Sequence, residues 1–409
     1  MKKIRMMILG YGQRGRIYGD YALRFPDEFE VVSVADTDAE RRAAAKSLFG
    51  CPVYAECEEM LKAGIRADLV AVATQDVDHE RHAVACMAAG YDLLLEKPIS
   101  NTIAGCRAIC AAAEQYGARA IVCHVLRYTP FYRKIKEILD SGRLGEIVTV
   151  SASENVGYYH QAHSFVRGPW RNSIESSPMI LAKCCHDMDI LRWLIGKPCL
   201  SVASFGGLKY FKSENAPAGS AAFCSDCAAE SCPYRAQKVY LRYRWMASYF
   251  CSDTANDRLL IEKLRHSAYD RCVFRCDNDV VDHQVTILNF GEGVTASHSM
   301  TAFSKEIYRD IKIHGTRAEL TGVMERSELE IRPFDGETET VFLKNDASVG
   351  GHGGGDQGMM HEVYLALNGE AAKGITYLDV SAESHYMAFA AEQSRLAGGI
   401  PQSTVEMRL

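Results

Sequence analysis

The chain has 409 residues, of which 47% are hydrophobic and 24% are charged, with a formal net charge of −6. This composition excludes a largely disordered protein and provides enough apolar surface for two or three domains. An acidic balance without a basic stripe argues against nucleic acid as a partner. No stretch approaches the roughly 18 apolar residues that span a bilayer, so we expect no membrane association.

The first 125 residues alternate short apolar runs with amphipathic segments. The apolar runs predict strands at Ile4–Leu9, Glu30–Asp36, Leu69–Ala73, Asp92–Glu96 and Ala120–His124. The segments between them predict helices at Gly15–Phe25, Asp38–Phe49, Asp78–Ala89 and Asn101–Tyr116. Apolar strands separated by helices are typical of a parallel sheet covered on both faces. We therefore expect a doubly wound α/β domain of the Rossmann type over residues 1–125.

The pattern changes after residue 125. Longer, alternating segments predict strands at Ile147–Glu154, Val280–Phe290, Val294–Thr301, Ile307–His314, Glu328–Arg332 and Thr338–Leu343. Helices are predicted at Thr129–Ser141, Pro178–Gly196, Gln357–Asn368 and Val380–Ala397. Alternation is typical of an antiparallel sheet with one face in solvent. We therefore expect residues 126–409 to form an α+β domain with a large, mostly antiparallel sheet. We also expect this domain to bind substrate and to mediate oligomerisation.

A glycine-rich motif follows the first predicted strand. The sequence Gly10-Tyr11-Gly12-Gln13-Arg14-Gly15 fits G-x-G-x-x-G and opens a predicted helix, which is the context of a dinucleotide site. Gly10, Gly12, Gln13, Arg14 and Gly15 are therefore the predicted pyrophosphate-binding residues. Asp36 ends the second strand, where a carboxylate accepts hydrogen bonds from ribose and repels a 2′-phosphate, so NAD is favoured over NADP. The alternative is a glycine-rich turn of another α/β fold.

Two further segments carry groups suited to acid–base chemistry. Lys97, in Glu96-Lys97-Pro98, follows a parallel strand at the edge where ligands bind such sheets. His186 lies in an otherwise apolar helical pattern, and an imidazole with a near-neutral pKa suits proton abstraction from an alcohol. From the residues alone, Lys97 is equally well explained as a solvated lysine, and His186 as a core histidine bonded to a carbonyl.

The ordered set of these motifs resembles the Gfo/Idh/MocA family of sugar oxidoreductases over essentially the whole chain. It comprises the glycine motif, Asp36, Thr74 with His79, Glu96-Lys97-Pro98, and His186-Asp187. The resemblance implies that Lys97 touches substrate and nicotinamide ribose, and that His186 is the general acid/base. It also implies that Thr74, His79, Glu96 and Arg127-Tyr128 lie near the cofactor, and that the second domain has a sheet like that of dihydrodipicolinate reductase. The Lys97–Pro98 peptide is often cis in that family.

Further residues are candidates for substrate binding. Many members of the family carry Asp four residues before the catalytic histidine, but this chain has Ala182 there, followed by Lys183, which we expect to donate to substrate. Polar and aromatic residues upstream are candidates for binding a hydroxyl-rich ligand, namely His163, Arg167, Trp170 and Arg171. A structured surface loop is the alternative. The stretch Gly350–Gly358 predicts a tight loop in which His352 and Asp356 reach the pocket.

Fifteen cysteines are scattered through the chain, a pattern typical of reduced thiols in a cytoplasmic protein. Cys224, Cys227 and Cys232 stand apart as C-x-x-C-x-x-x-x-C in a polar loop. They fit a structural zinc site that lacks a fourth ligand, with Cys251 and His266 as guesses, and they also resemble iron–sulfur ligation. Free thiols or one disulfide are the alternatives.

The leading functional hypothesis is an NAD-dependent dehydrogenase that acts on a secondary alcohol of a sugar, cyclitol or sugar derivative. Two other classes stay open: an NAD-dependent enzyme that cleaves glycosides through transient oxidation, and a non-catalytic nucleotide sensor. The expected partners are a small carbohydrate or polyol and further copies of the chain in a dimer or tetramer.

Overall fold

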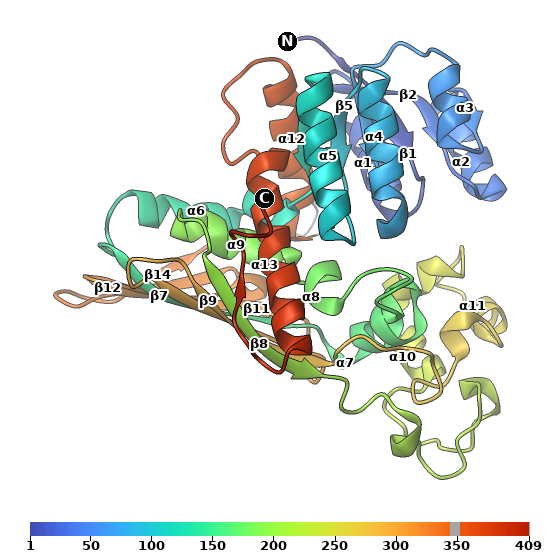
Figure 1. The fold of residues 1–409 in the computed structure, drawn as a ribbon. Helices are drawn as coiled ribbons and strands as arrows, with labels where there is room; N and C mark the ends of the chain where they lie inside the picture. The colour runs from blue at the N-terminus through green and yellow to red at the C-terminus, as the bar shows by residue number, and fades with distance from the viewer. Residues whose placement is uncertain (344–351, 409) are drawn as a thin grey trace.

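The computed structural model describes residues 1–343 and 352–408. Two β-sheets form its framework, one in the N-terminal part and one in the remainder, and the final helices of the chain lie between them (Figure 1). This arrangement confirms the predicted fold class, a Rossmann sheet combined with a large, mostly antiparallel sheet.

The N-terminal sheet is parallel and has the strand order β3-β2-β1-β4-β5-β6, the order of a dinucleotide-binding fold. Its strands and helices are β1 (Ile4–Leu9), α1 (Gln13–Arg24), β2 (Phe29–Ala35), α2 (Ala39–Phe49), β3 (Val53–Tyr54), α3 (Cys57–Lys62), β4 (Leu69–Val72), α4 (His79–Ala88), β5 (Asp92–Leu95), α5 (Ile103–Tyr116) and β6 (Ala120–Val122). The sequence did not predict β3 or α3, which are too short to show a period.

Successive side chains of the parallel strands enter two separate cores. Met6 and Ile8 of β1 pack with Tyr18 and Tyr21 of α1, whereas Met7 and Leu9 face the core that contains α4 and α5. Burial on both faces explains why the strands contain almost no polar residues.

A helix from the far end of the chain completes one of these cores. Met359, Met360 and Val363 of α12 (Gly355–Leu367) are fully buried against the α1 side of the parallel sheet. Tyr377 then forms a bridge with Ile121 at the β6 edge. The C-terminal part of the chain therefore helps to fix the Rossmann sheet.

The second sheet has nine strands in the order β14-β13-β12-β11-β7-β10-β9-β8-β15. All neighbours are antiparallel except β7 and β10, which run parallel. The strands are β7 (Ile147–Asn155), β8 (Ser201–Gly207), β9 (His283–Asn289), β10 (Thr295–Thr301), β11 (Tyr308–Gly315), β12 (Ala318–Val323), β13 (Glu328–Pro333), β14 (Glu339–Phe342) and β15 (Gln402–Ser403). The sequence did not predict β8, β12 or β15.

One face of this sheet is covered by helices and the other is open. The inner face contacts α9 (Cys185–Ile195) and α13 (Leu378–Leu396), and α6 (Pro130–Asp140) packs on α9 (Figure 1). The alternating burial of β9 leaves Val285 and Ile287 exposed on the outer face.

Two sequence predictions need correction. The helix predicted at Pro178–Gly196 is broken at Lys183 and Cys184, between α8 (Met179–Ala182) and α9. The stretch Gly350–Gly358 is not one tight loop, because His352–Gly354 forms a 3₁₀ turn and Gly355 begins α12; Gly350 and Gly351 lie outside the described residues.

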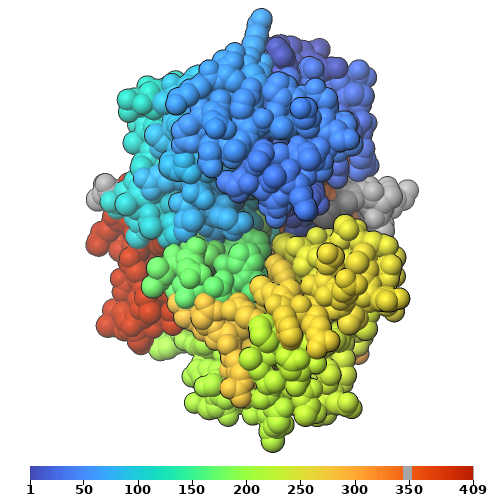
Figure 2. All heavy atoms as spheres, turned by 90° about the vertical axis from the view of Figure 1, so that its right-hand side faces the viewer, coloured from blue at the N-terminus to red at the C-terminus, as the bar shows by residue number. Residues whose placement is uncertain are grey.

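Residues 208–282 form a largely irregular segment whose helices the sequence did not predict. It contains the short helices α10 (Ala236–Arg242) and α11 (Asp257–Leu264) among 3₁₀ turns. Figure 2 shows its yellow part, around residue 250, directly below the blue N-terminal half. The Tyr249 hydroxyl donates to Gln13 Oε1 at 2.5 Å, so this segment touches the start of α1.

Candidate active site

The glycine motif adopts the conformation that its residue types require. Gly10 has φ +91°, and a Cβ there would lie 2.5 Å from the Ala73 carbonyl oxygen. A Cβ at Gly15 would lie 2.1 Å from the Gly10 carbonyl oxygen, so helix and turn approach as closely as glycine allows. At Gly12 a Cβ would meet only Arg41 Nη1, at 3.6 Å. Gly12 precedes α1 without any side-chain cap, which leaves open backbone and free N–H groups at the helix start.

Asp36 is held in place by backbone donors. Its carboxylate accepts hydrogen bonds from the N–H groups of Tyr11 at 2.7 Å and Asp38 at 2.8 Å. The bond from Tyr11 holds the carboxylate beside the glycine motif. Arg41, from α2, lies 3.7 Å from the same carboxylate, a neighbour that the sequence analysis did not anticipate.

Thr74 and His79 shape the turn after β4. The Nδ1 atom of the buried His79 lies 2.6 Å from the Pro98 carbonyl oxygen, and its Nε2 atom 3.2 Å from the Thr74 carbonyl oxygen. Both ring nitrogens therefore face protein oxygens, and His79 ties the β4 turn to the cis Lys97–Pro98 peptide. The Thr74 hydroxyl contacts His82 Nδ1 at 3.0 Å.

Glu96 is the centre of a buried charge network. Its carboxylate pairs with Arg14 and accepts a hydrogen bond from the Tyr18 hydroxyl. Arg14 also pairs with Asp356 at 2.7 Å, which contacts His352 at 3.0 Å. Burial raises the pKa of Glu96, but Arg14 and then Lys97 outweigh it and hold that pKa below the usual value. The network joins the glycine motif to the start of α12.

Lys97 and His186 come from different parts of the fold, the first after β5 of the parallel sheet and the second in α9, and both lie near the turn between α8 and α9. The Lys97 ammonium donates to the Ala182 carbonyl oxygen at 3.1 Å, four residues before His186. His186 is buried, and its Nδ1 atom has no hydrogen-bond partner among the described residues. Burial, and then the charge of Lys97, hold the pKa of His186 well below 6.5. The imidazole is therefore neutral and able to accept a proton.

Two more histidines lie near His186, of which His124 is buried and His352 is exposed. The His186 ring centroid lies 5.7 Å from that of His124 and 6.0 Å from that of His352. Burial lowers the pKa of His124 to about 4, so this ring is neutral as well. Asp189, also of α9, is bound by both forks of Arg127 at 2.7 and 2.6 Å. The pair fixes α9 against the segment that follows β6.

Lys183 belongs to a second charge network, distinct from the one around Glu96. Its ammonium is 3.3 Å from Glu154, which also pairs with Arg309 at 2.5 Å, and Arg309 donates to Asp187 at 2.9 Å. The sequence analysis missed Glu154 and Arg309. The sequence pattern could have revealed them, because both residues occupy inward-facing positions in strands that alternate between buried and exposed residues. The two residues also face each other directly where β7 pairs with β11.

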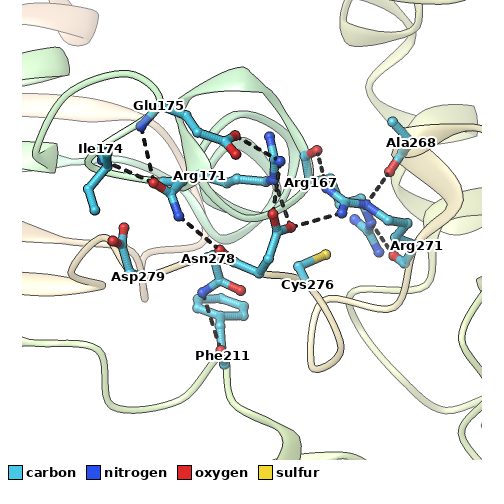
Figure 3. A network of polar contacts seen from close by, with 12 residues as sticks. Arg167, Arg171, Ile174, Glu175, Phe211, Ala268, Arg271, Cys276, Asn278 and Asp279 are labelled. Carbon is cyan, nitrogen blue, oxygen red and sulfur yellow. Dashed lines mark hydrogen bonds and ion pairs between the residues drawn. The ribbon is translucent and has the colours of Figure 1, made fainter.

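The other predicted substrate residues do not gather around Lys97 and His186. Arg171 pairs with Asp277 at 2.8 Å and with Glu175 at 3.0 Å. In the polar network drawn in Figure 3, Arg171 and Arg271 lie on opposite sides. Arg171, Arg271 and Tyr269 line an open hollow of about 410 Å³. Trp170 donates weakly to Asp76 at 3.4 Å. Substrate contacts by Arg171 and Trp170 therefore stay predictions.

Arg167 and His163 are buried in the interior instead. Arg167 donates to the carbonyl oxygens of Arg271 at 2.7 Å and Tyr234 at 2.6 Å. His163 contacts the Tyr240 hydroxyl at 3.0 Å and stacks on Tyr269. Both belong to the π-helical turn Gln161–Arg167, and neither has a described contact with Lys97 or His186.

The three cysteines of the predicted metal loop lie together, but the two residues suggested as a fourth ligand lie elsewhere. Cys224, Cys227 and Cys232 line a small cavity to which Cys272 contributes the fourth thiol. Cys251 packs in a neighbouring core, and His266 contacts Asp226 at 2.9 Å. Within the part of the chain that the structure describes, the closely spaced group of possible metal ligands is Cys184, Asp187 and His298 and not these cysteines, so zinc finds no support here.

Comparison with known proteins places the chain in a family. Residues 4–124 match the "Oxidoreductase family, NAD-binding Rossmann fold", and residues 136–382 match the "Oxidoreductase family, C-terminal alpha/beta domain". The chain belongs to the Gfo/Idh/MocA family. This confirms the resemblance drawn from the motifs, and the protein is an NAD-dependent oxidoreductase.

Relatives and solved structures agree with this assignment. YteT of Bacillus subtilis, whose name places it among oxidoreductases, is 26% identical over 370 residues, which are 84% of this chain and 83% of YteT. Inositol 2-dehydrogenase 2 of Saccharopolyspora erythraea is 32% identical over 178 residues, but the match spans only 42% of this chain and 48% of that enzyme. WlbA dehydrogenase of Bordetella pertussis, solved with NADH and UDP-GlcNAcA, has the same fold, with a TM-score of 0.71, 18% identity and 98% coverage of both chains. Levoglucosan dehydrogenase with NADH and levoglucosan gives a TM-score of 0.73 at 16% identity, with 98% of this chain and 99% of that chain covered.

Across the described residues, no helix is both long enough and apolar enough to cross a membrane.

Proposed function

We propose that this member of the Gfo/Idh/MocA family oxidises a secondary alcohol of a sugar, cyclitol or sugar derivative with NAD. The observation that carries the proposal is the position of the Lys97 ammonium, which binds the Ala182 carbonyl oxygen four residues before the buried His186 and whose charge helps to lower the pKa of that imidazole. These are the two groups that alcohol oxidation needs, a proton acceptor and a cation beside the developing alkoxide. Inositol and levoglucosan dehydrogenases among the relatives and similar folds support the substrate class.

Each of these residues has its own role in the proposed reaction. Lys97 donates a hydrogen bond to the substrate oxygen and stabilises its negative charge as the O–H bond breaks. His186 takes the hydroxyl proton, and its depressed pKa favours release of that proton to water afterwards. When bound, NAD would supply the hydride acceptor for the carbinol carbon. The residues of the glycine motif and Asp36 would hold the dinucleotide and orient it for this transfer.

Variants of the two central residues test the proposal. We expect His186→Ala and Lys97→Ala each to lower kcat/KM about 10²- to 10⁴-fold, the usual range for a lost acid–base group or charge donor. NADH formation is measured with a panel of sugars and cyclitols, and NAD binding is measured separately by calorimetry. His361→Ala and Lys134→Ala, which change exposed or partly exposed side chains, are matched controls.

Undiminished turnover in both central variants would contradict the proposal. Cleavage of glycosides without net NADH formation would contradict net oxidation but leave the cofactor site intact. NAD binding with no activity on any polyol or glycoside would instead favour a nucleotide sensor.

The preference for NAD over NADP is part of the same proposal. The carboxylate of Asp36, fixed by two backbone donors, would repel a 2′-phosphate, whereas Arg41 beside it would attract one. We expect Asp36→Ser to free Arg41 and shift the NAD/NADP ratio of kcat/KM toward NADP by about 10-fold or more, about 1.4 kcal/mol. An unchanged ratio would show that Asp36 does not face the ribose.

Location and assembly complete the proposal. All fifteen cysteines are unpaired, which supports a reducing, cytoplasmic environment. The outer face of the nine-stranded sheet exposes Phe205, Val285 and Ile287, and this apolar face supports a dimer or tetramer.

A further inference from the structure

Four cysteines from two distant stretches of the irregular segment enclose one small space. Cys224, Cys227 and Cys232 lie in the loop after β8, and Cys272 lies 40 positions beyond Cys232, far along the chain. A backbone bridge between Phe223 and Arg271 sets Cys224 beside Cys272, and the Cys272 N–H donates to Ala222 at 2.8 Å. The cavity between the four side chains has a volume of about 10 Å³, enough for a body the size of a water molecule.

A buried arginine points to an anionic occupant of this space. The Arg167 side chain lines the cavity and is 1% exposed, and its Nη2 atom lies 3.6 Å from Cys224 Sγ. Its other bonds go to two carbonyl oxygens, and Nη1 has no partner. Among residues 1–343 and 352–408 no carboxylate pairs with it, although an uncompensated buried charge is costly.

Metal–thiolate ligation would supply the missing negative charge. Four thiolates around a divalent ion or a [4Fe–4S]²⁺ core carry a net charge of about −2, which a neighbouring guanidinium stabilises. The Ala229 N–H already points at Cys227 Sγ, at 3.4 Å, a contact typical of a metal-bound thiolate.

We propose that Cys224, Cys227, Cys232 and Cys272 ligate one metal centre, either a single zinc ion or an iron–sulfur cluster. No three of these sulfurs lie within 4.8 Å of one another, whereas the sulfurs around a tetrahedral zinc ion are about 3.8 Å apart. The spacing favours the larger centre, and the small cavity favours the single ion. The thiolate ligand set is common to both.

The proposed centre is structural and independent of hydride transfer. It would join the loop after β8 to the residues around Arg271 and to Arg167 at the end of the π-helical turn. That turn carries His163, which stacks on Tyr269 and lies 4.9 Å from the ring of Tyr249. Tyr249 in turn contacts the start of α1, so the centre would stabilise the wall that the segment presents to the cofactor loop.

The experiment is elemental analysis of the full chain purified without oxygen. We expect about one zinc per chain, or about four iron and four acid-labile sulfide per chain, and either result supports the site. Cys224→Ser and Cys272→Ser should lose most of the metal. Cys276→Ser is the matched control, because Cys276 lies beside Arg167 and Arg271 (Figure 3), but its thiol donates to the Cys272 carbonyl oxygen and does not line the cavity.

A second measurement on the unaltered protein covers the case in which the serine variants fail to fold. Removal of the metal by a chelator should make four additional thiols reactive toward a thiol reagent. Absence of both metals from the purified chain, combined with no uptake of zinc or of ferrous iron with sulfide, would overturn the proposal. Loss of metal in Cys276→Ser but not in Cys272→Ser would also overturn it. None of these readouts depends on dehydrogenase activity.

Discussion

Ionisable groups are buried in two regions of the molecule, and the two regions differ in the backbone structure that carries these groups. Around Lys97 and His186, regular strands and helices carry most of the groups, and the buried carboxylates Glu96, Asp187 and Asp189 each meet an arginine. In residues 208–282 the backbone is mostly a series of turns, and the Arg167 side chain, which enters this segment from the π-helical turn, meets only carbonyl oxygens and a thiol.

The difference indicates what stabilises each region. In the first, hydrogen-bonded ladders fix the backbone, so the buried charges are tolerated because they are paired. In the second, few ladder bonds exist, and the chain relies on aromatic stacking such as Tyr159 on Tyr243, and on its cysteines. Removing one member of a charge pair should therefore harm the first region most.

The largest expected effect is that of Arg309→Met. This change leaves Glu154 and Asp187 buried without their shared cation, and loss of one partner from a buried pair costs about 3–5 kcal/mol. The free energy of unfolding in urea measures it. Arg143→Met, which removes an exposed pair with Glu339, should cost less than about 1 kcal/mol. Equal losses in the two variants would contradict the view that pairing supports the first region.

A pair of glycine variants separates stability from binding within the first region. In Gly15→Ala the new methyl group would meet the Gly10 carbonyl oxygen at 2.1 Å, so the turn must move, at about 3 kcal/mol of stability. Gly12→Ala has no close neighbour, and its unfolding should change by less than about 1 kcal/mol. Its NAD affinity should nevertheless fall about 10-fold or more, because the methyl group stands where the backbone approaches the pyrophosphate. Thermal unfolding and calorimetric NAD titration measure the two effects, and unchanged NAD affinity in Gly12→Ala would contradict the assigned cofactor site.

The same contrast explains what the sequence could predict. The strands of the parallel sheet were identified because burial on both faces produces continuous apolar runs, as in Leu69–Val72. Lys97 and His186 could be singled out because each belongs to a motif of the family, one after a strand and the other in a helix, and their roles stay predictions. The two-residue strand β3 could not be recognised, since so few residues show no period.

Other parts of the candidate sites depend on contacts between residues far apart in the chain, which a local sequence pattern does not predict. Cys272 becomes the neighbour of Cys224 only through the bridge between Phe223 and Arg271, so the search for a fourth thiol near the loop failed. Arg167 and Trp170 were grouped with the substrate because they adjoin polar residues in sequence. The π-helical turn sends Arg167 inward, and a single altered turn is not visible in composition. By contrast, Arg309 shares its strand face with Ile311 and Ile313, so an inward charge could have been predicted there.

We expect a smaller effect than that of Arg309→Met, in the form of a pH dependence, at the junction of the two regions. His163 belongs to the turn from the first region and stacks on Tyr269 of the second; burial, with the charge of Arg167, lowers its pKa to about 3. In the unfolded chain the pKa is about 6.5, so the unfolded state gains the proton first as the pH falls. The stabilisation by neutral His163 is complete above about pH 6.5 and declines below it, by about 2 kcal/mol between about pH 7.5 and about pH 5. His163→Phe keeps the stacking and cannot take up a proton, so its free energy of unfolding should fall less over this range. His361→Phe, at an exposed position, should follow the unaltered protein. If the His163→Phe and unaltered curves ran parallel, the ring would have to be reached by water, and the aromatic wall between the two regions would be open rather than packed.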